Sequence, residues 1–154
     1  MIVKFLLVTA AVLLGTAFCF GQRTAPATKP TPSPTGDLQS VRSSPAYAEL
    51  LLQKTELQST LESFLVDYTE EHPKVKELRS EIRLLQVEMD RLLTVKPENS
   101  GRLTLALGKL MLRKVELETQ LEALAAQYKD DHPDVRKAKR KVEVFESAIK
   151  EILG

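Results

Sequence analysis

The apolar residues that follow Ala46 recur at alternating intervals of three and four positions. This seven-residue period is typical of a helix that buries one side against its neighbours, whereas a half-buried strand alternates at every second position. Four segments of the chain show this seven-residue period, so the pattern predicts an all-α protein. Their seams are Tyr47, Leu50, Lys54, Leu57, Leu61, Phe64 and Tyr68; Val75, Leu78, Ile82, Leu85, Met89 and Leu92; Leu107, Leu110, Lys114, Leu117, Leu121, Leu124 and Tyr128; and Val135, Ala138, Val142, Phe145, Ile149 and Ile152.

The second half of this region repeats the first. When residues 50–93 are set against residues 110–153 without a gap, 12 of the 44 pairs are identical, which identifies a tandem duplication with a period of 60 residues. The repeats span 46–94 and 103–153. The eight residues between them, VKPENSGR, interrupt the helical pattern with proline and glycine.

Each repeat has the same short sequence between its helical segments, YTEEHPKV in the first and YKDDHPDV in the second. Proline fits the first position of a helix, where its missing N–H group would have no partner. The residue before a proline is pushed out of helical geometry, so the histidine falls at the N-cap. The tyrosine and the valine can meet across the turn and close the hairpin. This turn motif comprises Tyr68, His72, Pro73, Val75, Tyr128, His132, Pro133 and Val135.

Matched helices joined by short turns predict two tandem antiparallel helical hairpins with coiled-coil-like seams. Their short joint favours an up-down-up-down four-helix arrangement with both His-Pro turns at one pole. The alternative is a pair of separate hairpins that bury their seams by self-association. Lys54 and Lys114 occupy matching seam positions, where a lysine fixes helix register while its stem packs. We expect this tandem helical-hairpin domain to span residues 46–154.

The N-terminus has the pattern of a bacterial secretory signal, with Lys4 ahead of an apolar run. We expect residues 1–21 to be a signal peptide cleaved before Gln22, with cleavage after Ala17 as an alternative. Residues 22–45 carry five prolines among Thr, Ser and Ala, which predicts a disordered linker. The protein is then exported and resides in the periplasm or cell envelope.

Two alternatives concern the same apolar run. Cys19 is a candidate lipidation site, and the run itself is a candidate uncleaved membrane anchor, although a span needs about 20 apolar residues. Cys19 is the single cysteine of the chain. Cleavage before Gln22 therefore leaves a mature protein without thiol or disulfide chemistry.

The charge of the chain is balanced, with 22 Lys and Arg against 21 Asp and Glu, so no global field selects nucleic acid, membrane or an anionic substrate. Charge gathers locally in the run VRKAKRKV. This run either forms a helix face exposed to solvent, or it binds an anionic polysaccharide, a phospholipid surface or an acidic protein. Nucleic acid is not expected, because no aromatic residues lie between these cations to stack on bases. The run contains Arg136, Lys137, Lys139, Arg140 and Lys141.

The turns also contain the residues most suggestive of chemistry. If the two turns meet, His72 and His132 could bind one metal ion together with the neighbouring acids. Neither turn has two ligands one helical turn apart, so we interpret them as caps and expect no metal and no cofactor. The chain has no glycine-rich phosphate loop and no nucleophile with a neighbouring base. We therefore expect no catalytic residues and no enzymatic activity.

The order of a leucine seam, Tyr, His-Pro and Val resembles the periplasmic coiled-coil segment of the polysaccharide chain-length determinant, or exopolysaccharide co-polymerase, family of bacterial inner membranes. The resemblance covers the helices only. It implies long periplasmic helices and a role near polysaccharide export. The matching residues are Leu61, Tyr68, His72, Pro73 and Val75, then Leu121, Tyr128, His132, Pro133 and Val135.

Together these patterns predict an exported, non-catalytic coiled-coil scaffold or interaction module of the bacterial cell envelope, with a role accessory to polysaccharide export as one candidate. Its partner is another protein or a second copy, bound through the heptad seams, with an anionic polysaccharide or a membrane surface as a further candidate. The alternative function is that of a small periplasmic metal-binding or chaperone-like helical-hairpin protein.

Overall fold

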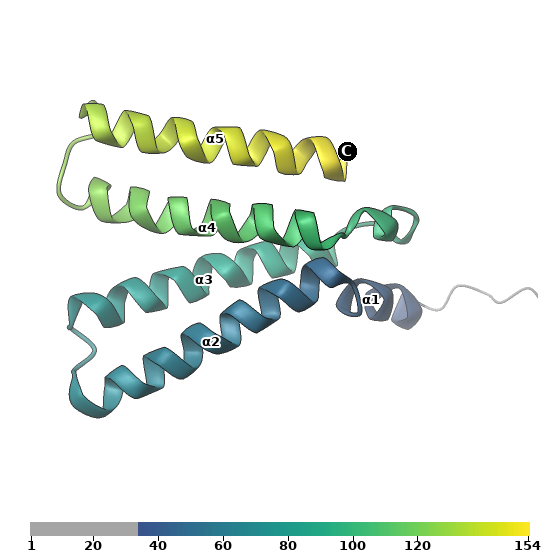
Figure 1. Ribbon diagram of the computed structural model, residues 1–154, viewed down its shortest axis with the longest axis horizontal. Coiled ribbons are helices and arrows are strands. Elements are labelled where there is room, and N and C mark those ends of the chain that lie inside the picture. The colour runs from purple at the N-terminus through teal and green to yellow at the C-terminus, as the bar shows by residue number, and fades with distance from the viewer. Residues whose placement is uncertain (1–33) are drawn as a thin grey trace, which may run out of the picture. The chain divides into compact units, whose positions relative to one another are not determined.

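The computed structural model describes residues 34–154, and these residues are helical with no strand among them. The predicted signal peptide, 1–21, and the first part of the predicted linker lie outside the described residues. The all-α prediction is confirmed (Figure 1). The elements are α1 (Pro34–Arg42), α2 (Pro45–Asp67), α3 (Pro73–Leu93), the 3-10 helix η1 (Pro97–Arg102), α4 (Leu105–Ala125) and α5 (Pro133–Leu153).

The four long helices form two antiparallel hairpins that run up, down, up and down, as predicted. The first hairpin pairs α2 with α3, and the second pairs α4 with α5. The joint between the repeats folds as η1, and Figure 1 shows both His-Pro turns at the end of the domain opposite η1. Pro73 and Pro133 lie at the helix starts, where the sequence placed them.

The helices do not close into a symmetric bundle. Helix α4 packs against α2, α3 and α5, whereas α5 packs mainly against α4 and also contacts η1. Helix α5 therefore forms an outer edge of the domain (Figure 1). Among its seam residues Val142, Phe145 and Ile152 are only half-buried.

The main core lies near η1, where the two hairpins cross. A Cβ atom added to Gly108 of α4 would lie 3.1 Å from the backbone of Ala46 in α2, so glycine permits a very close crossing. The amide of Ala46 also donates to the carbonyl of Leu103, at 3.2 Å. The buried side chains of this core are Val41, Ala46, Leu50, Leu85, Met89, Leu92, Leu103, Leu107, Met111, Val115 and Ile149.

The end of the predicted linker differs from expectation. Residues 34–42 form α1, and Val41 is only 1% exposed because it packs into the main core. The prolines of the linker become sparse after Pro34, which leaves a stretch able to form a short helix that a buried apolar residue fixes. Ser44 then caps α2 by accepting from the amide of Tyr47 at 3.3 Å. The ordered domain thus begins before residue 46.

A buried ionic cluster joins the two hairpins. The Lys114 ammonium of α4 lies 2.6 Å from Glu88 of α3 and 3.1 Å from Glu146 of α5. Arg91 of α3 completes the cluster, 3.0 Å from Glu146. Burial alone would lower the pKa of Lys114, but the hydrogen bond and charge of Glu88 outweigh burial and raise it. The cluster therefore holds Lys114 charged.

The duplication accounts for the contact of Lys114 with Glu146, but not for its contact with Glu88. Lys54 and Gln86 occupy the positions in the first repeat that Lys114 and Glu146 occupy in the second, and they form the same bond within their hairpin, at 2.5 Å. The contact of Lys114 with Glu88 has no such counterpart, because it crosses from one repeat to the other. One seam lysine therefore links only its own hairpin, and the other links both.

The two seam lysines give a matched pair of variants. Lys114→Ala leaves the buried Glu88 with only the more distant Arg91, 3.6 Å away, so we expect it to lower the free energy of unfolding by about 3 kcal/mol. Lys54→Ala removes a half-buried hydrogen bond and should cost about 1 kcal/mol. Urea unfolding at neutral pH measures both, and equal losses would show that Lys114 does not join the hairpins.

The same cluster gives the fold a dependence on pH. Burial by itself would raise the pKa of Glu146, but hydrogen bonds from Arg91 and Lys114 outweigh it and lower the pKa from 4.5 to about 2. A carboxyl group whose pKa is lower in the folded state stabilises the fold above its unfolded pKa. This contribution is lost as the pH falls from about 4.5 towards 2.

Glu146→Gln should therefore lower the free energy of unfolding at neutral pH and lose less of it than the unmodified chain between about pH 4.5 and pH 2. Urea unfolding at a series of pH values measures the difference. Glu143→Gln, which changes an exposed carboxylate on the same helix, serves as the control and should follow the unmodified chain. Parallel curves for Glu146→Gln and the unmodified chain would contradict the assignment.

Candidate functional site

The two histidines cap the helices that follow them, as the sequence predicts. His72 Nδ1 accepts a hydrogen bond from the amide of Lys74 at 3.2 Å, and His132 Nδ1 accepts from the amide of Asp134 at 3.3 Å. Each histidine has extended backbone geometry and precedes a proline at the first helical position. One ring nitrogen of each histidine is therefore engaged in holding a helix start.

The tyrosines of the turn motif lie against the histidines. The ring centroids are 4.3 Å apart for Tyr68 and His72 and 4.2 Å apart for Tyr128 and His132. The expected contact between tyrosine and valine stays a prediction. The valines are fully buried, while the tyrosines are nearly half-exposed at 48% and 44%. The ring stacking was missed, although the spacing of four residues between Tyr and His is a signal for it.

The acidic residues of the turns pair with cations of the next helix. Glu70 pairs with Arg79, Glu71 with Lys76, and Asp130 with Lys139. A hydrogen bond from Lys76 lowers the pKa of Glu71. These pairs are largely exposed and hence weak, but each links a turn to the helix that follows it.

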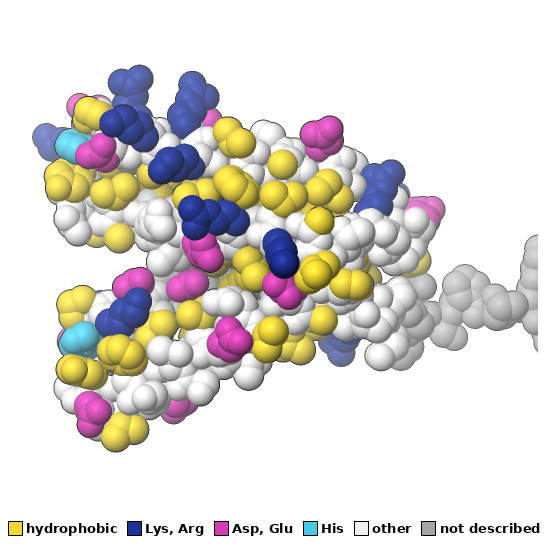
Figure 2. Space-filling model, in the orientation of Figure 1, with side chains coloured by type: hydrophobic (Ala, Val, Ile, Leu, Met, Phe, Trp, Pro, Cys, Tyr) yellow, Lys and Arg dark blue, Asp and Glu magenta, His cyan; other side chains and the backbone are white. Residues whose placement is uncertain are grey.

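The metal hypothesis for His72 and His132 gains no support from this geometry. Figure 2 shows the two histidine side chains at the tips of separate hairpins, with a gap between them. Within residues 34–154, no group of three or more His, Cys, Asp or Glu side chains is arranged to hold a metal ion. The turns are therefore two separate caps rather than halves of one site.

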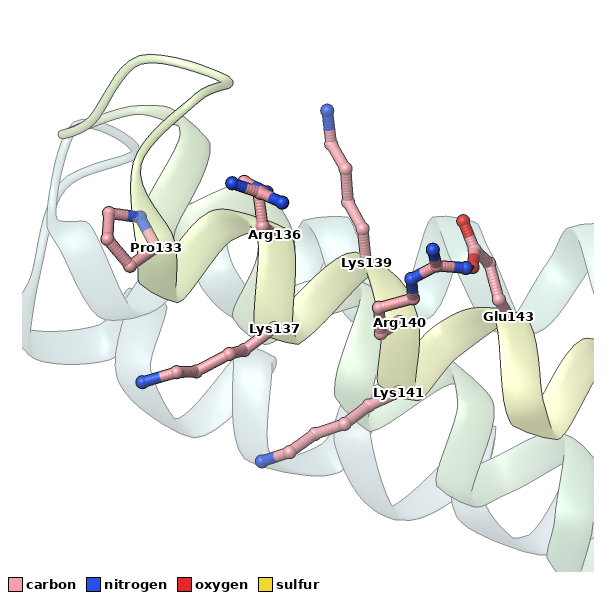
Figure 3. Close-up of a pocket in the computed structure, with 7 residues that line it drawn as sticks. All are labelled: Pro133, Arg136, Lys137, Lys139, Arg140, Lys141 and Glu143. Carbon is pink, nitrogen blue, oxygen red and sulfur yellow. The ribbon is translucent and has the colours of Figure 1, made fainter.

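The predicted basic run lies on the first half of α5. We call its cations Arg136, Lys137, Lys139, Arg140 and Lys141 the basic end. Together with Pro133 and Glu143 they line a hollow of about 770 Å³ (Figure 3). All these residues belong to one helix, so the hollow is an open surface between long side chains. Figure 3 shows Lys137 and Lys141 projecting to one side of α5, and Lys139 projecting to another.

The basic end is only partly neutralised. Asp134 lies 3.5 Å from Lys137, and Glu143 lies 2.9 Å from Arg140, in pairs that are largely exposed and hence weak. Arg136 and Lys141 form no ion pair within the described part of the chain. The cations of α3 contrast with these, because Lys74, Lys76, Arg79 and Arg83 each pair with a carboxylate.

The two repeats differ in charge at the basic end. Glu77 and Glu81 of α3 correspond to Lys137 and Lys141 of α5. Two exposed or half-exposed acids of the first repeat are thus replaced by two exposed cations in the second. The alignment of the repeats contains this signal, which the basic run alone does not show.

An apolar groove runs beside the basic end, between α4 and α5. It has a volume of about 330 Å³, and Val144 on its wall is 67% exposed. Lys141 and Arg113 form its charged rim. The heptad pattern does not reveal this groove, because it predicts that the whole seam of α5 is buried. The remaining lining residues are Leu117 and Phe145.

No known protein family, no curated protein and no solved structure matches this chain. The helices in the described range include none that is both long and apolar enough to span a membrane.

Loss of the histidine cap should weaken the fold without any change in metal response. We expect His72→Ala to lower the free energy of unfolding by about 0.5–1 kcal/mol, because the amide of Lys74 loses its acceptor. His72→Asn, which keeps a side-chain acceptor, should recover most of this. Urea unfolding with zinc and with EDTA measures both effects. A stabilisation by zinc that disappears in His72→Ala and His132→Ala would contradict the cap assignment.

Proposed function

We propose that this protein is an exported, non-catalytic scaffold of the bacterial cell envelope that binds an anionic polysaccharide through the basic end of α5. Two helical hairpins form its rigid part, and the proline-rich segment tethers it. The role is accessory to polysaccharide export, in line with the resemblance of its helices to the chain-length determinant family.

The observation that carries this proposal is the charge difference between the repeats. The helices α3 and α5 share one fold and the same cap, yet the second repeat has Lys137 and Lys141 where the first has Glu77 and Glu81. The fold of the hairpin does not require cations at these positions, because the first hairpin forms with acids there. The cations therefore fit a contact outside the hairpin.

The form of the basic end favours a polymer. Its five cations project from several sides of an exposed helix rather than into an enclosed pocket (Figure 3). Such a surface attracts repeated negative charges along a chain and does not select a single small anion. Binding of this kind is electrostatic and is screened by salt.

The repeats supply a test that preserves the fold. Lys137→Glu with Lys141→Glu places the residues of the first repeat into the second, so the hairpin should fold normally. We expect the affinity for an immobilised anionic polysaccharide to fall about tenfold or more, equivalent to about 1.4 kcal/mol. Binding of the unmodified chain should weaken with salt and be absent on neutral dextran.

A matched control changes the charge by the same amount elsewhere. Lys74→Glu with Lys96→Glu alters a half-exposed and an exposed lysine outside the basic end and should leave polysaccharide binding nearly unchanged. Equal losses in the two double variants would show that only net charge matters. Binding to anionic phospholipid vesicles without binding to the polysaccharide would overturn the proposal in favour of a membrane surface.

A further inference from the structure

The packing of the second hairpin on the first, within one chain, provides a model for packing between two chains. Helix α4, the first helix of repeat two, packs against both α2 and α3 of repeat one. By the duplication α4 corresponds to α2, and the pair α4–α5 corresponds to the pair α2–α3. The α4–α5 pair is therefore built like a surface that already accepts a helix of the α2 type.

Helix α4 docks on the first repeat through one side, and the corresponding side of α2 is exposed. Met111 and Val115 of α4 are 0% and 1% exposed, because they face the first repeat. Their counterpart Leu51 is 46% exposed, and neighbouring Leu52 is 57% exposed. We call this side the donor face. It consists of the exposed residues Ala48, Leu51, Thr55 and Ser59, which correspond to the buried residues Gly108, Met111, Val115 and Thr119.

The positions that receive the docked helix show the opposite difference. They are buried or half-buried in the first repeat and more exposed in the second. In the first repeat Ala46 and Leu92 are fully buried. In the second repeat the counterpart of Ala46 is exposed, and the counterpart of Leu92 is half-buried. We call the second-repeat positions the acceptor face. It consists of Ala106, Leu110, Val144, Ala148 and Ile152, which correspond to Ala46, Leu50, Leu84, Glu88 and Leu92.

The acceptor face lacks the buried charge of its counterpart. Glu88 meets Lys114 in the junction inside the chain, at 2.6 Å, whereas Ala148 has no charge at the corresponding position. The donor lysine that would face Ala148 is Lys54, which already bonds to Gln86 of its own hairpin. A junction between two copies would thus need no carboxylate there. It would also lack the ion pair that joins the hairpins within one chain.

The two helices that would meet carry opposite net charges. Helix α2 carries four carboxylates and one lysine, whereas α5 carries six cations and four carboxylates. Inside the chain Glu122 of α4 pairs with Arg83 at 2.5 Å and also bonds to Ser80. By the same correspondence, Glu62 of an incoming α2 would meet Arg140, which stands in the position of Ser80, and Glu143, which stands in the position of Arg83 and pairs with Arg140 at 2.9 Å.

We propose that the α4–α5 acceptor face binds the α2 donor face of a second copy of this chain. The contact joins two different surfaces, so every added copy leaves one donor face and one acceptor face free. Such head-to-tail contacts produce an open row, or a ring if the rotation closes. This inference goes beyond polysaccharide binding, which involves the basic end of α5, and it adds a role for α2.

Two single variants separate the faces. Thr55→Arg places a cation on the donor face, and Ala106→Arg blocks the acceptor face; both residues are exposed in one chain. Thr60→Arg is a matched control, because Thr60 and Thr55 lie on the same helix and bond in the same way to the carbonyl four residues earlier. Its counterpart Gln120 is exposed, so Thr60 lies outside the donor face.

Sedimentation velocity of the full chain over about a hundredfold concentration range measures the assembly. We expect the unmodified chain and Thr60→Arg to grow in mass with concentration, and each blocked variant to stay monomeric. A one-to-one mixture of the blocked variants should give dimers and nothing larger, because each variant retains the face that the other needs.

A monomeric unmodified chain across the whole range would overturn the proposal. Dimers of either blocked variant alone, or a mixture that stays monomeric beside an assembling unmodified chain, would equally overturn it in favour of a symmetric interface. Circular dichroism confirms that the variants fold, and Ser59→Arg replaces Thr55→Arg if the latter unfolds. Polysaccharide binding by monomeric Thr55→Arg tests the proposed function separately, since that variant retains the basic end.

Discussion

The close crossing of α4 over α2 is the constraint on which the rest of this fold depends. Gly108 lies so near the backbone of Ala46 that a side chain would not fit without movement. This approach brings α4 into contact with both helices of the first hairpin, and it places Lys114 beside Glu88. Because α4 is committed to the first repeat on one side and to α5 on another, α5 is left at the edge. The open groove and the exposed basic end both follow from that position.

Much of this architecture could be predicted from periodicity and duplication. The seams gave the four long helices, and the His-Pro turns gave the helix starts at Pro73 and Pro133, because a proline restricts its own residue and the one before it. The pattern could not show that α5 would be covered on one flank only, since a half-buried seam and a buried seam have the same period. It also could not separate α1 from the linker, because the burial of Val41 depends on residues distant in sequence.

The candidate site shows a similar division. The cap role of His72 and His132 follows from local chemistry, and the structure confirms it. Whether the two turns approach one another depends on the angle between the two hairpins, which local sequence does not encode. Divergence between the repeats proved more informative than either repeat alone. Where two copies of one fold differ in charge or burial, the hairpin fold cannot be the reason for the difference, which then reflects a contact outside the hairpin, either with the other repeat or with another molecule.

The anchoring of Val41 in the main core has a mechanical consequence. Helix α1 leads directly into α2, and it packs against η1 and α3 at the end where the hairpins cross. Tension applied from the N-terminal side therefore enters the domain at the end that holds the main core. The load must pull α1 away from the core before it reaches α2, while the hairpin tips bear none of it. An applied force would thus detach α1 first and leave the surfaces on α5 folded.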